Sequence, residues 1–228
     1  MMRYAISRRL VLAAAGTLAA ETAIARVADP ESREQALIAA AERGVMDDVR
    51  RLLGEGAQVD GRDSRGRTAL LIATIHNRVE VARALIAAGA DVNAKDTQSD
   101  SPFLYAGAEG RLDILRMTLA AGADLRSTNR YGGTALIPAC HRGHVEAVRE
   151  LLKTGIDIDH INNLGWTALL EAIILGDGSA RYVEIVRLLV GARANPNLAD
   201  RDGIGPLTHA RRRGFGAIAG ILQAAGAR

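Results

Sequence analysis

The sequence predicts an all-α solenoid of about six helix-turn-helix units joined by short β-hairpin-like loops. Three observations favour this fold. Residues of the same kind return at a spacing of 33 positions along the 228-residue chain. Hydrophobic residues make up 48% of the chain but aromatic residues only 3%, and the 24 glycines suit many evenly placed turns. A core built from small aliphatic side chains favours closely packed helices, and a fixed period of this length is typical of repeat proteins.

Four series of residues carry the repeat and stay in phase. One consists of Gly56, Gly89, Gly122 and Gly155, followed by Arg193 after 38 residues and by Gly226 after another 33. A single pair of helices cannot bury its apolar face alone, so we expect the units to stack on their neighbours. The other three series are Leu37, Leu70, Phe103, Leu136, Leu169 and Leu207; Ala40, Ala73, Ala106, Ala139, Ala172 and Ala210; and Gly44, Asn77, Gly110, Gly143, Gly176 and Gly214.

The fourth unit shows how each repeat is expected to fold. Thr134 is predicted to cap a short first helix by accepting a backbone N–H bond. Gly143 is predicted to end that helix, because glycine adopts the left-handed conformation freely. A second amphipathic helix is predicted over residues 145–153, with Gly155 as its end.

The segment Leu85-Ile86-Ala87-Ala88-Gly89-Ala90-Asp91-Val92-Asn93 and the turn Gly143-His144 resemble the ankyrin repeat. The resemblance covers roughly residues 31–228, although the Thr-Pro-Leu-His box of the family is degenerate here. It implies a repeat domain over 34–228 that binds another protein without catalysing a reaction. The predicted repeats are approximately 34–66, 67–99, 100–132, 133–165, 166–203 and 204–228.

Residues 1–25 have the pattern of an export signal, and 26–33 are predicted to be a linker. A basic stretch ends at Arg8-Arg9, an apolar run follows, and Ala23-Ile24-Ala25 fits a signal-peptidase site. The run is about half of the roughly 20 residues that span a bilayer, so a retained anchor is the weaker interpretation. The paired arginines indicate a twin-arginine signal, with an ordinary secretory signal as the alternative. Both predict a periplasmic protein without stable membrane insertion after cleavage.

Two departures from the repeat leave alternatives open. Residues 177–182 lengthen the loop inside the fifth unit by five residues. This insertion is either a tolerated surface loop, which costs little free energy, or a protrusion that presents Arg181 and Tyr182 to a partner. Arg193 replaces a helix-ending glycine, which costs about 1–2 kcal/mol if the left-handed conformation persists. The alternative is a turn rebuilt with the help of Pro196.

The resemblance places the partner on the concave side, formed by the hairpin tips and the first helices. Binding energy usually concentrates in Trp, Tyr and Arg, so we predict a hot spot centred on Tyr131 and Trp166 with Arg130 and Arg142 beside it. The alternative is that Trp166 packs across its own hairpin. The predicted partner-binding residues are Arg65, Arg67, His76, Gln98, Arg130, Tyr131, His141, Arg142, Leu164, Trp166 and Ile204.

No catalytic, metal-binding or cofactor-binding site is predicted. Cys140 and His141 are helix neighbours that point about 100° apart, and His144 is an ordinary turn residue of the repeat. Motifs for phosphate loops and serine nucleophiles are absent from the sequence. A net charge of +3 is too small to indicate a nucleic-acid partner. We therefore expect a monomer that binds a protein; the alternatives are an accessory or protective factor for a periplasmic enzyme, or an enzyme in its own right.

Overall fold

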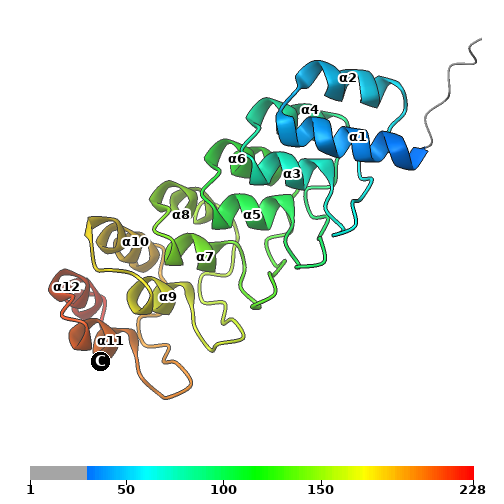
Figure 1. Cartoon of the computed structure of the whole chain (residues 1–228). Coiled ribbons are helices and arrows are strands. Elements are labelled where there is room, and N and C mark those ends of the chain that lie inside the picture. The colour runs from blue at the N-terminus through cyan, green and yellow to red at the C-terminus, as the bar shows by residue number, and fades with distance from the viewer. Residues whose placement is uncertain (1–29) are drawn as a thin grey trace, which may run out of the picture.

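The computed structural model describes residues 30–228, which form twelve helices arranged as six pairs. The pairs stack side by side into an elongated solenoid, and the hairpin loops project from it along one side (Figure 1). The predicted all-α solenoid is confirmed. The first helices of the pairs are α1 (Pro30–Arg43), α3 (Ala69–Ile75), α5 (Pro102–Ala108), α7 (Leu136–His141), α9 (Ala168–Ile174) and α11 (Pro206–Arg212). The second helices are α2 (Met46–Gly54), α4 (Val79–Ala87), α6 (Leu112–Ala120), α8 (Val145–Leu151), α10 (Ala180–Gly191) and α12 (Gly216–Ala224).

The predicted signal at residues 1–25 lies outside the described residues. Helix α1 begins at Pro30, inside the segment 26–33 that the sequence assigned to a linker. Within residues 30–228, no helix combines the length and the apolar character needed to cross a bilayer.

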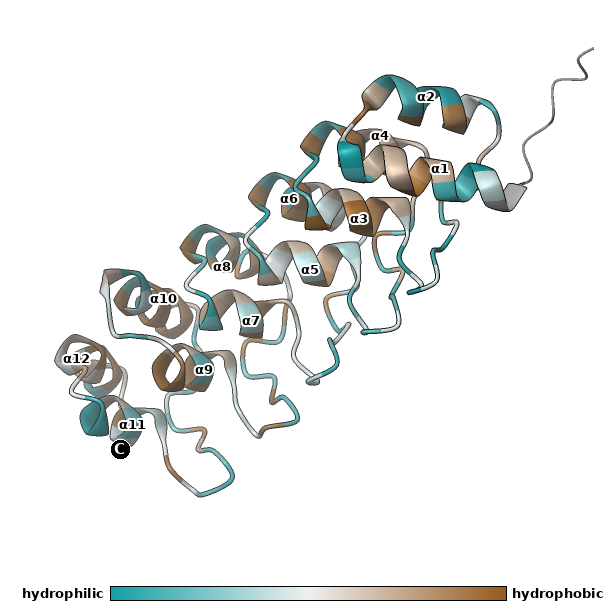
Figure 2. Cartoon of the chain, viewed as in Figure 1, coloured by the Kyte–Doolittle hydropathy of each residue, from teal (hydrophilic) through white to brown (hydrophobic). Residues whose placement is uncertain are grey.

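The core runs as one continuous strip between the two rows of helices. All six alanines of the repeat series, from Ala40 to Ala210, have an exposed fraction of 0%. Small side chains at this position let each first helix approach the next closely, so the stacked helices leave few voids. Figure 2 shows the hydrophobic residues on the helices and mainly hydrophilic ones along the projecting hairpins.

In the second, third and fifth units, a Ser or Thr side chain caps the first helix as predicted, but in the fourth unit it does not. The hydroxyls of Thr68, Ser101 and Thr167 each accept an N–H bond of 3.2 Å from the residue three positions on. The prediction for Thr134 is wrong: its Oγ1 is buried without a hydrogen-bond partner, and α7 begins at Leu136. In the next unit the Glu171 N–H donates to the Thr167 carbonyl at 2.9 Å. Pro138 holds the same place in the fourth unit and has no N–H, so the first turn is rebuilt.

The second helices end in the left-handed conformation in every unit except the fourth. Arg193 keeps this conformation with a φ of 72°, so the expected strain is carried and Pro196 does not relieve it. The prediction for Gly155 is wrong, because α8 already ends at Leu151 and Gly155 is not among the residues with positive φ. Thr154 takes over the role of a cap. Its hydroxyl donates to the Leu151 carbonyl at 2.6 Å and accepts the Ile156 N–H at 3.2 Å.

Half of the insertion in the fifth unit is helical: residues 177–179 form a loop as predicted, whereas residues 180–182 belong to α10. Helix α10 has 12 residues where α4 has 9, and it includes Arg181 and Tyr182. Tyr182 is only 8% exposed, and its hydroxyl donates to the His141 carbonyl at 2.7 Å. Tyr182 therefore ties α10 to the preceding unit and is not free to contact a partner. The bend into α10 uses Gly178, with a φ of 73°, instead of the predicted Gly176.

Candidate functional site: a hollow on the inner face

The hairpins that project from the inner face share one turn design. Each begins with an Asp or Asn whose side-chain oxygen accepts the N–H groups of the residues two and four positions on. In the fourth hairpin, Asn162 Oδ1 accepts from Leu164 at 2.9 Å and from Trp166 at 3.0 Å. These side-chain bonds add to the backbone bond that the same Asp or Asn donates across each hairpin, and together they fix the shape of a tight turn. The residues of this series are Asp63, Asp96, Asn129, Asn162 and Asp200.

Two neighbouring hairpin tips are also bonded to each other. The Asn163 N–H donates to the Tyr131 carbonyl at 2.9 Å, and His160 Nε2 lies 2.7 Å from the Gly132 carbonyl oxygen. Tyr131 and Leu164 are therefore presented on tips that are held in register.

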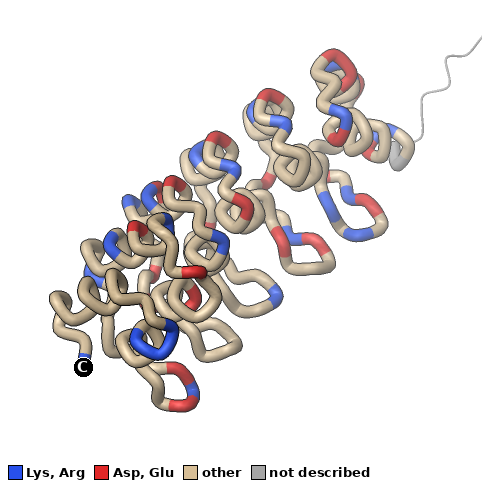
Figure 3. Tube along the Cα trace, turned by 60° about the vertical axis from the view of Figure 1, so that its left-hand side comes forward, with Lys and Arg blue, Asp and Glu red and all other residues tan. Residues whose placement is uncertain are grey.

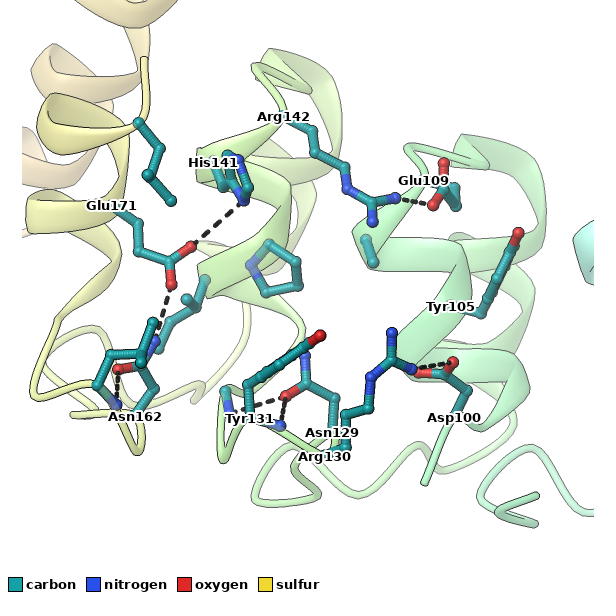
Figure 4. A pocket seen from close by; sticks show the side chains of 16 residues that line it. Asp100, Tyr105, Glu109, Asn129, Arg130, Tyr131, His141, Arg142, Asn162 and Glu171 are labelled. Atoms are coloured by element: carbon teal, nitrogen blue, oxygen red, sulfur yellow. Dashed lines mark hydrogen bonds and ion pairs between the residues drawn. The ribbon is translucent and has the colours of Figure 1, made fainter. Parts of the chain in front are cut away.

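These tips and the helices beside them enclose a hollow of about 360 Å³ (Figure 4). The floor is formed by α5, α7 and α9, and one edge is formed by the two hairpins. This volume is at the lower end of the roughly 300–1,000 Å³ of ligand pockets, and it suits one or two inserted side chains. The lining residues are Asp100, Tyr105, Ala108, Glu109, Asn129, Arg130, Tyr131, Gly133, Ile137, Pro138, His141, Arg142, Asn162, Leu164, Glu171 and Leu175.

Exposed apolar side chains gather at this hollow. Tyr131 is 55% exposed, Leu164 48% and Leu175 41%, and all three line it. Only two further large apolar residues in the described part of the chain are exposed to a similar degree. These are Ile161, in the same hairpin as Leu164, and Val45, between α1 and α2. Exposed apolar surface that is concentrated in one place and rimmed by polar groups typically marks an interaction site.

Both arginines of the hollow are already neutralised. Arg130 lies 3.5 Å from Asp100, and its guanidinium sits 4.9 Å above the ring of Tyr131. Arg142 forms an ion pair with Glu109 (Figure 4). Burial raises the pKa of Asp100, an effect that Arg130 and Arg142 oppose. The two arginines thus serve as counter-charges for carboxylates within the same wall.

Glu171 is a buried carboxylate with an incomplete set of partners. It is 6% exposed, and its Oε1 accepts a bond of 2.8 Å from Asn162 Nδ2. Its Oε2 lies 3.7 Å from His141 Nδ1, which is too long for a hydrogen bond. Burial raises the pKa of Glu171, and burial also lowers the pKa of His141. Because His141 is held towards its neutral form, Glu171 has no cationic partner at close range in the described structure.

The structure brings together five of the predicted partner-binding residues: Arg130, Tyr131, His141, Arg142 and Leu164 all line the hollow. Trp166 does not. It is half-buried, and its backbone N–H and carbonyl both bond to Asn162 within its own hairpin. Leu164 occupies the place beside Tyr131 that the sequence analysis gave to Trp166.

The other five predicted residues lie elsewhere on the solenoid. Arg67 forms an ion pair of 2.7 Å with Asp63 inside the first hairpin, and His76 Nε2 lies 3.5 Å from Glu42. The remaining three belong to hairpins away from the hollow: Arg65 and Gln98 are exposed, and Ile204 is half-buried. Charges of both signs are spread along the solenoid, and the basic run 211–213 closes α11 at its far end (Figure 3).

Sequence reasoning missed several lining residues, and a signal was available for two of them. Glu171 is the only charged residue in the otherwise apolar helix α9. Asn162 belongs to a series of Asp and Asn residues that follows the repeat spacing. The missed residues also include Tyr105, Asn129, Ile137, Pro138 and Leu175.

Cys140 precedes His141 in α7 and is completely buried. Burial raises its pKa well above the ordinary value, and the nearby Glu171 adds to the effect. A buried thiol of this kind is unreactive. Within residues 30–228, no group of His, Cys, Asp and Glu side chains is arranged to hold a metal ion.

A solenoid of paired helices with a rigid, partly apolar hollow on its inner face defines the class of helical-repeat binding scaffolds. The sequence model described as "Ankyrin repeats (3 copies)" matches residues 10–96 and 103–200. The chain belongs to the ankyrin repeat family.

Solved structures agree with this assignment. A crystal structure of an ankyrin repeat domain from Acinetobacter baumannii AYE has a TM-score of 0.82 and 59% sequence identity, and the match covers 84% of this chain and 98% of that one. The crystal structure of a second ankyrin repeat protein has a TM-score of 0.81 and 42% identity, over 83% of this chain and 97% of that one.

A curated relative matches over a shorter stretch. The putative ankyrin repeat protein YahD of Escherichia coli (strain K12) is 51% identical over 57 residues, which is 25% of this chain and 28% of that protein. Ankyrin repeats generally mediate protein–protein interaction, and the fold is typically a non-catalytic module.

Proposed function

We propose that this chain binds a protein partner in the hollow on its concave face. The observation that carries the proposal is the concentration of large exposed apolar side chains there: Tyr131, Leu164 and Leu175 are three of the five large apolar side chains that the described residues expose. The export pattern of residues 1–25 supports a partner in the periplasm.

The energetics of the hollow favour binding. Full burial of a large apolar side chain contributes about 1.5–3 kcal/mol, and Tyr131 and Leu164 still have about half of their surface to bury. The hydrogen bonds within and between the hairpins fix both tips before a partner arrives. Less conformational entropy is then lost on association, which raises the affinity for a given contact area.

A photo-crosslinking experiment tests this proposal. A benzophenone amino acid replaces Leu164 in one sample of the full chain and Val45 in another, because both positions are exposed and apolar but only Leu164 lines the hollow. In cells that make the protein, we expect a defined crosslinked partner from position 164 and not from position 45. Adding Tyr131→Ala should reduce that product severalfold without loss of helicity. The same products from both positions, or a yield that Tyr131→Ala leaves unchanged, would refute the proposal.

A further inference from the structure

We infer that the hollow receives a basic side chain, an Arg or Lys in an extended segment of the partner protein, with Glu171 as its counter-charge. This inference rests on the proposed function and specifies the chemistry of the ligand at the same site. Three features of the hollow carry it: the balance of its charges, the geometry of the Glu171 carboxylate and the apolar walls beside it.

The charges of the hollow favour a cation over an anion. Arg130 is paired with Asp100 and Arg142 with Glu109, so these four groups cancel. An acidic ligand would have to draw an arginine away from its carboxylate, and a partly buried carboxylate left without its partner is costly. Glu171 has no such cationic partner, so the net charge left at the bottom of the hollow is negative.

The carboxylate is oriented to receive a donor. Asn162 holds Oε1, whereas Oε2 points towards His141 without a hydrogen bond (Figure 4). Each carboxylate oxygen can accept more than one bond, and a guanidinium or ammonium group donates to it more strongly than a neutral group does. A cation at this place would complete the coordination that the chain itself leaves open.

The walls of the hollow suit the rest of such a side chain. Leu164 and Leu175 line the hollow together with Glu171 and are exposed, and Tyr131 lines it from the neighbouring hairpin. Lys and Arg place their aliphatic stems against apolar surface while the charged head reaches a polar group. An apolar residue next to the basic one in the partner segment would cover the remaining exposed surface of Tyr131.

The experiment selects random heptapeptides on phage against the full chain. The best peptide is then compared with a copy in which its basic residue is replaced by a neutral isostere, citrulline for Arg or norleucine for Lys. We expect one position of the selected peptides to be basic and a neighbour to be apolar. The neutral copy should bind about tenfold more weakly, as expected for the loss of a hydrogen bond between charged groups.

The variant Glu171→Gln should bind both peptides alike, because Gln keeps an acceptor for Asn162 but carries no charge. His209→Gln is the matched control, since His209 holds the equivalent place in α11 and lies outside the hollow. That control should keep the tenfold preference for the basic peptide. Circular dichroism of each variant confirms that the helices are retained.

The possible results separate the two proposals. If Glu171→Gln keeps the preference while Tyr131→Ala with Leu164→Ala abolishes binding, the inference is wrong and the proposed site stands. If that double variant binds the peptides as well as the original chain does, the proposed site itself is wrong. Acidic selected peptides, or self-association of the chain that Glu171→Gln removes, would assign a different occupant and overturn the inference. Failure to select any peptide would count against both.

Discussion

The α9–α10 and α11–α12 pairs build the same contact from opposite chemistry. In both, the residue that opens the hairpin meets a side chain of the following helix: Asn162 bonds Glu171 at 2.8 Å, and Asp200 bonds His209 at 2.7 Å. In the last pair the carboxylate belongs to the hairpin, where it accepts two backbone N–H groups as well as the histidine. In the α9–α10 pair the carboxylate belongs to the helix and accepts a single bond.

This difference shows that side-chain exchanges can change the chemistry of one contact while the hairpin keeps its turn design. At α11 the chain itself supplies the hydrogen-bond partners of this contact. At α9 an amide takes the place of the hairpin carboxylate and a carboxylate takes the place of the helix histidine, so the negative charge lies on the helix instead of the turn. A buried polar group without a full set of partners costs stability, and under the proposal above a ligand would supply the partner that Glu171 lacks.

The substitution Asn162→Asp should have the largest effect of the changes that test this comparison. It keeps the oxygen that fixes the hairpin but sets a second carboxylate against Glu171, and two buried like charges at hydrogen-bond distance cannot both remain ionised without strong repulsion. We expect the free energy of unfolding at neutral pH to fall by about 3 kcal/mol, which urea denaturation would measure.

The control for this prediction is a double variant in which α9 makes the same side-chain contact as α11. Adding Glu171→His to Asn162→Asp gives the same pair of side chains as Asp200 and His209, on a hairpin and helix of the same design. Most of the lost stability should return. A double variant as unstable as the single one would show that the two pairs are not interchangeable.

Much of the fold could be predicted from the sequence because a repeat states its pattern many times. The alanine series predicted the closest helix contacts, and all six residues are buried. The wrong predictions fall where a neighbouring residue changes how a helix begins or ends. Pro138 lacks the N–H that would donate to the Thr134 carbonyl and close the first turn, and the Thr154 hydroxyl replaces the expected glycine turn at Gly155. Such competition between neighbours is invisible to a pattern averaged over repeats.

The candidate site was predictable only in part for a different reason. Tyr131, Arg130 and Arg142 follow from their residue types and their place on the concave side. Leu164 lines the hollow and Trp166 does not, and residue type alone does not predict which of two residues in one hairpin faces it. Glu171 was overlooked because a helix of apolar residues resembles a fully buried one, although its inner face also borders the hollow.

The pH dependence of stability should distinguish Glu171 from an ordinary surface carboxylate. Burial raises the pKa of Glu171 above the usual value of 4.5. At a pH between 4.5 and this raised pKa, Glu171 therefore holds a proton in the folded chain that it has lost in the unfolded chain. The free energy of unfolding must therefore fall as pH rises through that window. Glu171→Gln should lack this fall and be equal or about 1 kcal/mol more stable at pH 7. Urea midpoints from pH 4 to pH 7 that run parallel for both proteins would contradict the assignment.

The two pairs also differ at the end of the second helix, which gives the smallest expected effect. Arg193 and Gly226 hold the same place, with φ angles of 72° and 83°. The arginine is exposed, and within residues 30–228 its side chain makes no hydrogen bond or ion pair, so Arg193→Gly removes strain without removing a polar interaction. The relief of about 1–2 kcal/mol is partly offset by the extra freedom of glycine in the unfolded chain, leaving a gain of about 0.5 kcal/mol or slightly more.

Thermal unfolding would detect this gain as a small rise in Tm, and Gly226→Ala should lower Tm by a comparable amount. A loss of stability in Arg193→Gly would mean that the arginine stabilises the junction between α10 and the last hairpin, and that the strain there is compensated.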